Sequence, residues 1–253
     1  MGAVENFFTD AAGERRRAHT WALVQSQRTG VDGVQPGLQQ VCLAAVEGLG
    51  LAGAVVSLMT ATPEGVVGSE AIAATSDEHA RRVDELQFSL GEGPGRDAFR
   101  GGQPVLVPDL ERAVDRWPGY ARAACAAGVL AAFAFPLHVG AARFGVLSFY
   151  SSAARMLTDD DVTDCLLFAE LATELLLDSP ASEPNGANDP RLQNALDFRD
   201  EVYQAQGMVM VELGVSLIEA LARMRAHAYA AEQDLAALAA EIISGGAHLS
   251  LGH

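Results

Sequence analysis

The sequence predicts an α+β domain, in which helices flank an antiparallel sheet, followed by an all-α domain of three helices. Residues 36–178 mix helical periodicity with paired strand-like segments, whereas residues 191–246 carry helical periodicity alone. Residues 179–190 between them hold three prolines, two asparagines and a glycine, which end helices and central strands. We therefore expect a linker there, and a separate helical segment over residues 1–35.

Five segments read as strands, because each is apolar and is bounded by turn-forming residues. They cover residues 54–60, 66–73, 104–108, 129–138 and 143–150. Thr62–Gly65 predicts a turn between the first two, and Val139–Ala142 links the last two as a hairpin. Short connections of this kind indicate antiparallel pairing.

Helical segments surround these strands. They cover residues 14–28, 38–49, 76–88, 96–100 and 158–178. Ser76 and the acidic residues after it are expected to cap the third helix, and Thr158 with Asp161 predicts a capping box for the last. Residues 90–95 predict a glycine-rich loop, and Trp117–Gly119 predicts a break within a long connection.

The first helix of the second domain is expected to begin at Asp189–Pro190 and to end at Gly214. Two rows of residues run along it at heptad spacing. One row is Ala195, Phe198, Val202, Ala205 and Val209. The other row is Leu192, Leu196, Arg199, Tyr203, Gln206, Met210 and Leu213. One row should pack on the domain's own helices, and the other on a partner chain or on the helix that leaves the first domain.

The remaining two helices are shorter. Ser216 with Glu219 predicts a capping box for the second helix, and the third is expected to run from Asp234 to Gly245–Gly246. Three short helices of this kind form a small bundle.

Composition limits the classes of function. The 253 residues are 49% hydrophobic and 20% charged, which supplies enough apolar side chains for a packed core. All 17 basic residues are arginine, so Schiff-base, P-loop and Ser–Lys chemistries, which need lysine, are excluded. The 33 acidic residues give a formal net charge of −16, which argues against non-specific binding of polyanions.

The three cysteines, Cys42, Cys125 and Cys165, are too widely spaced for a zinc motif or a disulfide framework, so we expect a reducing cytoplasm. The apolar run at Val129–Leu137 is too short to cross a bilayer, and residues 1–10 lack signal-peptide features, so we expect no membrane association. We find no Ser–His–Asp arrangement, carboxylate pair or metal-ligand spacing, so we expect no enzyme activity, metal or cofactor.

The second domain resembles the ANTAR family, the C-terminal RNA-binding module of bacterial transcription antitermination regulators. The residues that carry this resemblance are Leu192–Leu196, Arg199, Val202–Met210, Gly214–Ser216, Glu219–Leu221, Met224–Arg225, Ala228 and Leu235–Ile243. They match in register and with the family's helix lengths.

The first domain resembles a GAF domain of the type that precedes ANTAR in actinobacteria. The matching pieces are Gly91–Pro94, Asp97–Phe99, Pro104–Asp109, Trp117–Pro118, Phe135–Leu137 and Gly145–Ser148. This resemblance implies a sensor of an unknown small molecule or partner protein, in a fold similar to the α+β order described above. The aromatic candidates for ligand contact are Phe99, Trp117, Phe133 and Phe135.

Together, the two resemblances imply a signal-responsive regulator. The GAF-like domain would control dimerisation or exposure of the ANTAR-like domain, which would bind structured hairpins of nascent RNA and promote transcription antitermination. We expect a homodimer formed around the helices over residues 162–178 and 192–213. The candidates for RNA contact are Arg199, Gln204, Gln206, Gly207, Arg223 and Arg225.

The alternative is a protein–protein or small-ligand signalling module that no longer binds RNA. Gln206 stands where the ANTAR family usually has lysine, and only four arginines lie beyond residue 190. GAF domains that hold haem or bilin use a histidine or cysteine, but His138 and Cys125 have no adjacent partner, which favours packing roles. The Gly91–Gly95 segment by itself is more typical of a turn than of a phosphate-binding loop.

Overall fold

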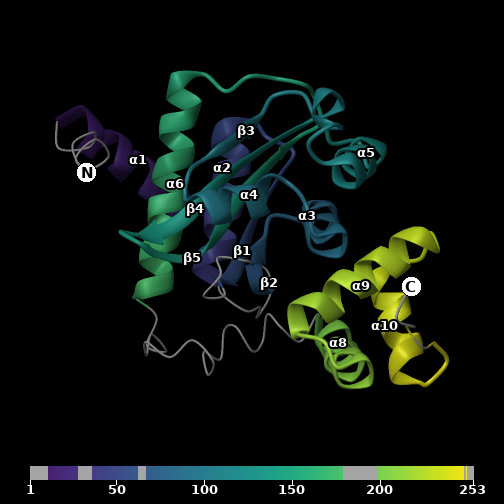
Figure 1. Cartoon of the computed structure of the whole chain (residues 1–253). Coiled ribbons are helices and arrows are strands. Elements are labelled where there is room, and N and C mark those ends of the chain that lie inside the picture. Colours follow the sequence, from purple (N-terminus) through teal and green to yellow (C-terminus); the bar gives the residue numbers. More distant parts are fainter. Residues whose placement is uncertain (1–10, 28–35, 62–66, 179–198, 248, 250–253) are drawn as a thin grey trace.

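The computed structural model describes residues 11–27, 36–61, 67–178, 199–247 and 249. Its centre is a five-stranded antiparallel sheet with the strand order β2-β1-β5-β4-β3 (Figure 1). The strands are β1 Gly53–Ala61, β2 Val67–Thr75, β3 Val105–Val107, β4 Ala131–Val139 and β5 Ala142–Ser151. The antiparallel sheet predicted from the sequence is confirmed, and β2 and β3 form its two edges.

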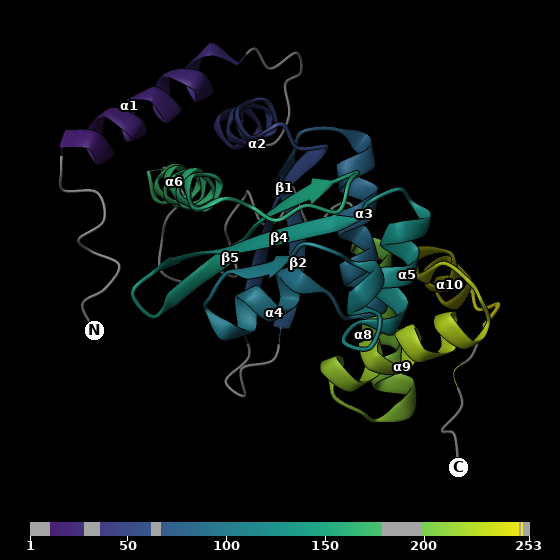
Figure 2. The same ribbon diagram turned by 90° about the horizontal axis from the view of Figure 1, so that it is seen from above.

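One face of the sheet is covered by helices α2 (Pro36–Leu49) and α6 (Asp159–Leu177). Helix α1 (Ala11–Ser26) lies outside this layer and packs on both helices (Figure 2). Arg17 of α1 ion-pairs with Glu170 of α6 at 2.6 Å. The capping box of α6, formed by the Thr158 and Asp161 pair, is confirmed.

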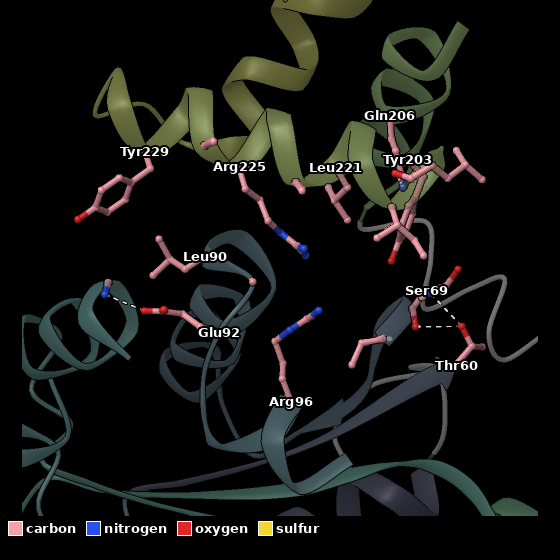
Figure 3. A pocket seen from close by; sticks show the side chains of 18 of the residues that line it. Thr60, Ser69, Leu90, Glu92, Arg96, Tyr203, Gln206, Leu221, Arg225 and Tyr229 are labelled. Carbon is pink, nitrogen blue, oxygen red and sulfur yellow. Dashed lines mark hydrogen bonds between the residues drawn. The ribbon is translucent and has the colours of Figure 1, made fainter. Parts of the chain in front are cut away.

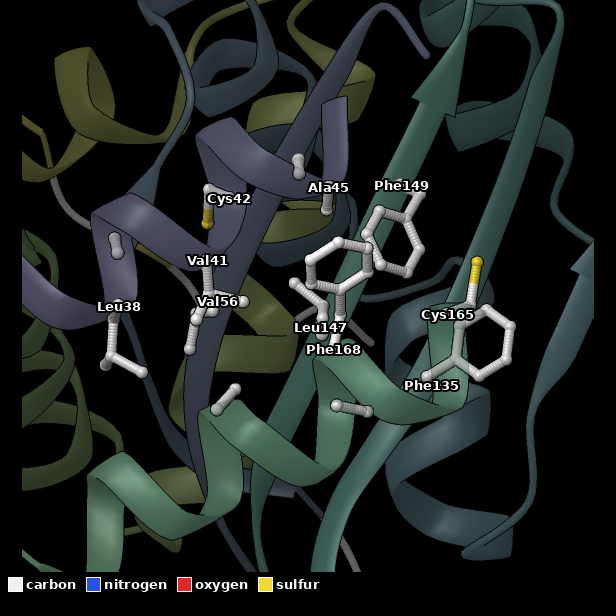
Figure 4. Close-up of a cluster of buried hydrophobic side chains, with 14 of the residues drawn as sticks. Leu38, Val41, Cys42, Ala45, Val56, Phe135, Leu147, Phe149, Cys165 and Phe168 are labelled. Atoms are coloured by element: carbon white, nitrogen blue, oxygen red, sulfur yellow. The ribbon is translucent and has the colours of Figure 1, made fainter. Parts of the chain in front are cut away.

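The apolar core lies between these helices and the sheet. Figure 4 shows Leu38 and Val41 of α2 and Phe168 of α6 on the same side of the sheet as Phe135 and Phe149. The rings of Phe135 and Phe149 lie 5.7 Å apart in an edge-to-face arrangement. The spacing of three and four along α2 therefore does place one continuous apolar stripe against the sheet.

The opposite face carries α3 (Glu78–Leu90), α4 (Pro94–Gly101) and α5 (Pro118–Ala126), with a 3-10 turn at Glu111–Ala113 before α5. A second apolar cluster fills the space beneath them, and the fully buried Tyr120 is one of its larger members. We call the sheet with α2 to α6 the sheet domain.

The predicted acidic cap of α3 is confirmed, whereas the starts of α4 and α5 differ from the prediction for local reasons. Asp77, one of the acidic residues expected to cap α3, does so, because its Oδ1 accepts two N–H groups of the first turn at 2.8 and 2.9 Å. Pro94 and Pro118 begin α4 and α5, although we expected them in a loop and at a break. Proline is well suited to a first helical turn, where its missing N–H has no partner to lose.

The remaining helices, α8 (Asp200–Leu213), α9 (Leu217–Ala230) and α10 (Leu235–Ile243), form a small bundle that we call the three-helix domain. Gly214 ends α8 in the left-handed conformation, as predicted. Of the two rows predicted along α8, the one with Val202, Ala205 and Val209 is buried among the domain's own helices.

The described start of the other row faces the sheet domain, a neighbour that the prediction did not include, whereas Met210 and Leu213 pack on the three-helix domain itself. Arg199 and Tyr203 hydrogen-bond to β2, whereas the Gln206 amide donates to the Leu217 carbonyl within the three-helix domain. Helix α6 covers the opposite face of the sheet (Figure 2). The predicted pairing with α6 is therefore absent from the described part of this chain.

Several predictions lie outside the described residues: the linker at 179–190, the N-cap at Asp189–Pro190 and the turn at Thr62–Gly65. Within the described ranges, no single helix is both long and apolar enough to cross a membrane. Helices α8 and α9 together have the length and apolar composition of a membrane-spanning segment, but the pair is bent by 105°.

Candidate functional site between the two domains

The three-helix domain docks on the sheet domain through a few side chains. The contact surface of the sheet domain is formed by the edge strand β2 and by the ends of α3 and α4. The matching surface of the three-helix domain comes from the start of α8 and the middle of α9. Each surface contributes charged and aromatic groups to the contact, among them Phe88 and Arg199.

Phe88, near the end of α3, is the anchor of this contact. Its ring belongs to the apolar cluster of the three-helix domain and is 3% exposed. The Arg199 guanidinium carbon lies 3.9 Å from the ring centroid, and that of Arg225 lies 5.2 Å away. The Tyr203 ring packs edge-on at 5.9 Å. Phe88 therefore combines apolar burial with two cation–π contacts.

Tyr203 covers the free edge of the sheet. Its hydroxyl donates to the Glu70 carbonyl at 2.8 Å and accepts the Glu70 N–H at 2.8 Å. The Glu70 carbonyl also accepts Nη1 of Arg199 at 2.9 Å. An uncovered edge strand presents unpaired backbone groups, and here the three-helix domain satisfies them at Glu70.

The Glu70 carboxylate is a buried anion among arginines. It is 0% exposed and its Oε2 forms an ion pair with Nη1 of Arg96. Its Oε1 lies 3.8 Å from Nη1 of Arg199 and has no hydrogen-bond partner among the described residues. Arg96 and Arg199 are 3% and 5% exposed, so this charge cluster is shielded from solvent.

Beside this cluster, a cavity of about 1080 Å³ opens between the domains. Figure 3 shows Arg225 extending into it from α9 and Arg96 from α4, with their guanidinium groups turned toward each other. Nε of Arg225 donates to the Phe88 carbonyl at 2.8 Å. The pKa of Arg225 is lowered to about 9, mainly by burial and secondly by the nearby charge of Arg96.

A buried polar network beneath α3 holds the anchor helix on the sheet. Asp84 accepts the hydroxyl groups of Ser57 and Tyr150, each at 2.6 Å, and the Gln87 amide at 3.0 Å. The pKa of Asp84 is raised, mainly because the carboxyl group is buried and secondly because the negative charge of Glu70 is near. The network fixes the end of α3, and therefore Phe88, against β1 and β5.

The glycine-rich segment after α3 is held by the same network. Gln87 Oε1 accepts the Gly95 N–H at 2.7 Å. A Cβ at Gly93, where φ is +138°, would lie 2.5 Å from that oxygen, so only glycine fits. The segment thus forms a tight turn next to the interdomain cavity, as the sequence favoured.

The six residues predicted to contact RNA fall into two groups. Arg199 and Gln206 are buried, at 5% and 8% exposed, and Arg225 is half-buried against Phe88 at the interdomain cavity. Gln204 is exposed, and Arg223 points outward and pairs with Glu219 at 2.6 Å. Space around Gly207 is open, because an added Cβ would meet nothing within 4 Å.

The four aromatic residues predicted to contact a ligand are all buried, on both faces of the sheet. Phe133 and Phe135 lie in the core under α2 and α6. Phe99 and Trp117 lie in two separate clusters under the helices of the opposite face. They do not line one common space, and their role toward a ligand stays a prediction.

Sequence reasoning did not identify Glu70 or Phe88, although each carries a signal in retrospect. Glu70 is the charged residue within strand β2, and Phe88 follows the apolar positions of α3 close to its end. Neither signal names a partner, because the contacting residues lie more than 100 positions away in the sequence.

Comparison with known families covers most of the chain. A family model described as a GAF domain matches residues 37–176, and one described as an ANTAR domain matches residues 191–243. No curated protein matches this chain.

Solved structures resemble the sheet domain. The GAF domain of an Acinetobacter phosphoenolpyruvate-protein phosphotransferase is 8% identical, with 70% of this chain and 99% of that chain covered and a TM-score of 0.48. The corresponding Coxiella burnetii domain is 16% identical, with coverage of 64% and 92% and a TM-score of 0.45. Free methionine-R-sulfoxide reductase of Neisseria meningitidis is 18% identical, with coverage of 78% and 99% and a TM-score of 0.40. Sequence identities and TM-scores this low indicate nothing about the activity of this chain.

Proposed function

The chain belongs to the GAF domain family and carries an ANTAR domain behind its GAF domain, and on this premise we propose how the two domains work together. The chain is a signal-responsive ANTAR regulator. Its ANTAR domain binds structured hairpins of nascent RNA and promotes transcription antitermination. Its GAF domain, which is the sheet domain described above, controls that activity by holding the ANTAR domain, which is the three-helix domain, in a docked position. The protein has no catalytic role.

The observation that carries this proposal is the packing of two ANTAR arginines against the GAF domain. Arg199 and Arg225 are two of the four arginines beyond residue 190, and both contact Phe88 of the GAF domain. While the GAF domain covers these two side chains, they are not available to the phosphate backbone of an RNA hairpin. Undocking frees both groups at once, so a signal that weakens docking increases the positive surface available to RNA.

We further propose that the protein is a cytoplasmic homodimer, formed through α8. The exposed face of α8 includes Met208 and Val211, which are 40% and 75% exposed. A second copy bound there would pair two RNA-binding domains, so that two weak contacts act together. Light scattering across a concentration series measures this directly, and Val211→Glu is expected to shift the protein toward monomer.

The test of RNA binding is a titration of the full chain with a fluorescent RNA hairpin at two salt concentrations. Phosphate contacts give an affinity that falls as salt rises. Arg223→Gln, on the exposed face of the ANTAR domain, should weaken binding at low salt and reduce the salt slope by about one. Arg122→Gln makes the same charge change at an exposed position of the GAF domain and should leave binding unchanged.

A transcription assay on a template with an intrinsic terminator then tests the finer function. Added protein should increase read-through, and Arg223→Gln should reduce that increase. If the chain shows no RNA binding at low salt in either the docked or an undocked form, the alternative of a signalling module that does not bind RNA holds instead.

A further inference from the structure

The interdomain cavity is lined by arginines from both domains. Arg96 and Arg100 come from α4 of the GAF domain, and Arg225 comes from α9 of the ANTAR domain. In Figure 3, the guanidinium groups of Arg96 and Arg225 face each other across open space. Two like charges held in this way repel each other unless an anion lies between them.

The charges of this pair are incompletely compensated by the protein. Arg96 has one ion pair, with Glu70, and its buried Nε has no hydrogen-bond partner among the described residues. Among the described residues, Arg225 forms no ion pair with a carboxylate, and its side chain donates one hydrogen bond, from Nε to the Phe88 carbonyl. With its pKa lowered only to about 9, Arg225 still carries its full charge at neutral pH.

The carboxylates on the cavity wall are engaged or distant from the pair. Glu92 Oε1 accepts the N–H groups of Gly119 and Tyr120 at 2.7 and 2.9 Å, and Figure 3 shows it turned toward α5. Asp200 lies at the start of α8 and is exposed. Arg100, which is 44% exposed and lies 3.8 Å from Asp97, adds a third cation at the cavity wall.

The rest of the wall is suited to an organic group. Leu90, Leu221 and Tyr229 line the same cavity, and Figure 3 shows Leu90 and Tyr229 on the side near Glu92. Tyr229 is 61% exposed, so its ring is available for packing. A binding site of this kind combines an apolar surface with a few charged groups that set the orientation.

We propose that this cavity binds a small organic phosphate, whose phosphoryl group lies between Arg96 and Arg225 and whose organic part packs on Leu90, Leu221 and Tyr229. A phosphoryl group has three terminal oxygens and a charge close to −2, so it can accept from two guanidinium groups on opposite sides. A carboxylate has two oxygens in one plane and one charge, which matches this arrangement less well. The proposal does not depend on RNA binding by the ANTAR domain.

Binding at this position links the two domains. The ligand contacts Arg96 and Arg225 together only while the domains are docked, so it stabilises the docked state by mass action. The cavity would thus let the concentration of a phosphorylated small molecule set the fraction of undocked ANTAR domain.

Isothermal titration calorimetry of the full chain with phenyl phosphate, in a phosphate-free buffer, tests the proposal. We expect saturable binding with one site per chain, and at least tenfold weaker binding for Arg225→Gln. Arg223→Gln is the matched control, because it removes the same charge from the same helix at a residue that pairs with Glu219 outside the cavity. Benzyl alcohol, which has the ring without the phosphoryl group, should not bind.

Arg100→Gln separates loss of positive charge at the cavity wall from undocking, since among the described residues Arg100 ion-pairs with Asp97 of the same domain. We expect it to weaken phenyl phosphate binding at least threefold while the exchange of α8 and α9 amides with deuterium stays unchanged. Absence of saturable binding to the wild type, or equal affinity of the wild type and Arg225→Gln, overturns the proposal. Either result leaves the RNA titration, which uses no phosphate ester, free to succeed or fail independently.

Discussion

Replacing Phe88 by alanine should detach the ANTAR domain while leaving both domains folded. The Phe88 ring is 3% exposed and meets Arg199, Tyr203 and Arg225 of the other domain. Truncation removes this buried ring and both cation–π contacts. Because the three-helix bundle keeps its own apolar cluster, the lost free energy should appear in the docking equilibrium rather than in the folding of either domain.

The size of the effect follows from known costs of truncating buried rings. Replacing a buried phenylalanine by alanine costs about 3–5 kcal/mol. The lower end of that range suits a contact between domains that can separate. With about 1.4 kcal/mol for each factor of ten, a loss of about 3 kcal/mol lowers the docking equilibrium constant by about 100-fold.

Hydrogen–deuterium exchange with mass spectrometry measures this change by segment. Peptides covering α3, α8 and α9 should exchange faster in Phe88→Ala, whereas peptides covering α2 should not. Met156→Ala is the control, because it truncates an apolar side chain of the same domain that is 79% exposed. Unchanged exchange in α3 and α8 would refute the reasoning, and so would an equal rise in α2, which would place the cost in the GAF core.

Three further predictions follow from single groups. Tyr203→Phe removes the hydroxyl that covers the edge of β2, so docking should weaken by about 1–2 kcal/mol, measured by the same exchange experiment. Partial burial acts to raise the pKa of Asp161, but the hydrogen bonds of the helix cap outweigh it and lower that pKa. This group therefore stabilises the fold above the ordinary aspartate pKa and loses the effect as pH falls through the lowered value. Asp161→Ala should cost about 1 kcal/mol in urea unfolding at pH 7, and progressively less below pH ~4. Burial raises the pKa of Cys42 to about 12 and also raises that of Cys165, so at pH 8 a disulfide reagent should modify the half-buried Cys125 first.

Local sequence rules predicted most of the fold because its elements carry their own signals. The stripe from Leu38 along α2, the Thr158 cap and the glycine at 214 each depend on neighbours within a few positions. The errors were also local. Pro94 and Pro118 were interpreted as breaks, although the same residue type also begins helices, and the surrounding packing selected the second role.

The candidate site was less predictable because it depends on contacts between distant segments. The row with Arg199 and Tyr203 indicated that α8 has a second neighbour, but periodicity does not say which surface covers it. Family resemblance indicated polar candidates for RNA contact, yet it contains no information on which of them a docked GAF domain buries. Only the arrangement in space shows that Arg225 and Arg96 share one cavity.

The affinity of Phe88→Ala for an RNA hairpin, compared with that of the wild-type chain at low and moderate salt, tests the central claim most directly. If docking withholds Arg199 and Arg225 from RNA, the variant should bind at least tenfold more tightly at low salt, with a steeper loss of affinity as salt rises. Equal or weaker binding by a variant whose domains have separated would contradict the account.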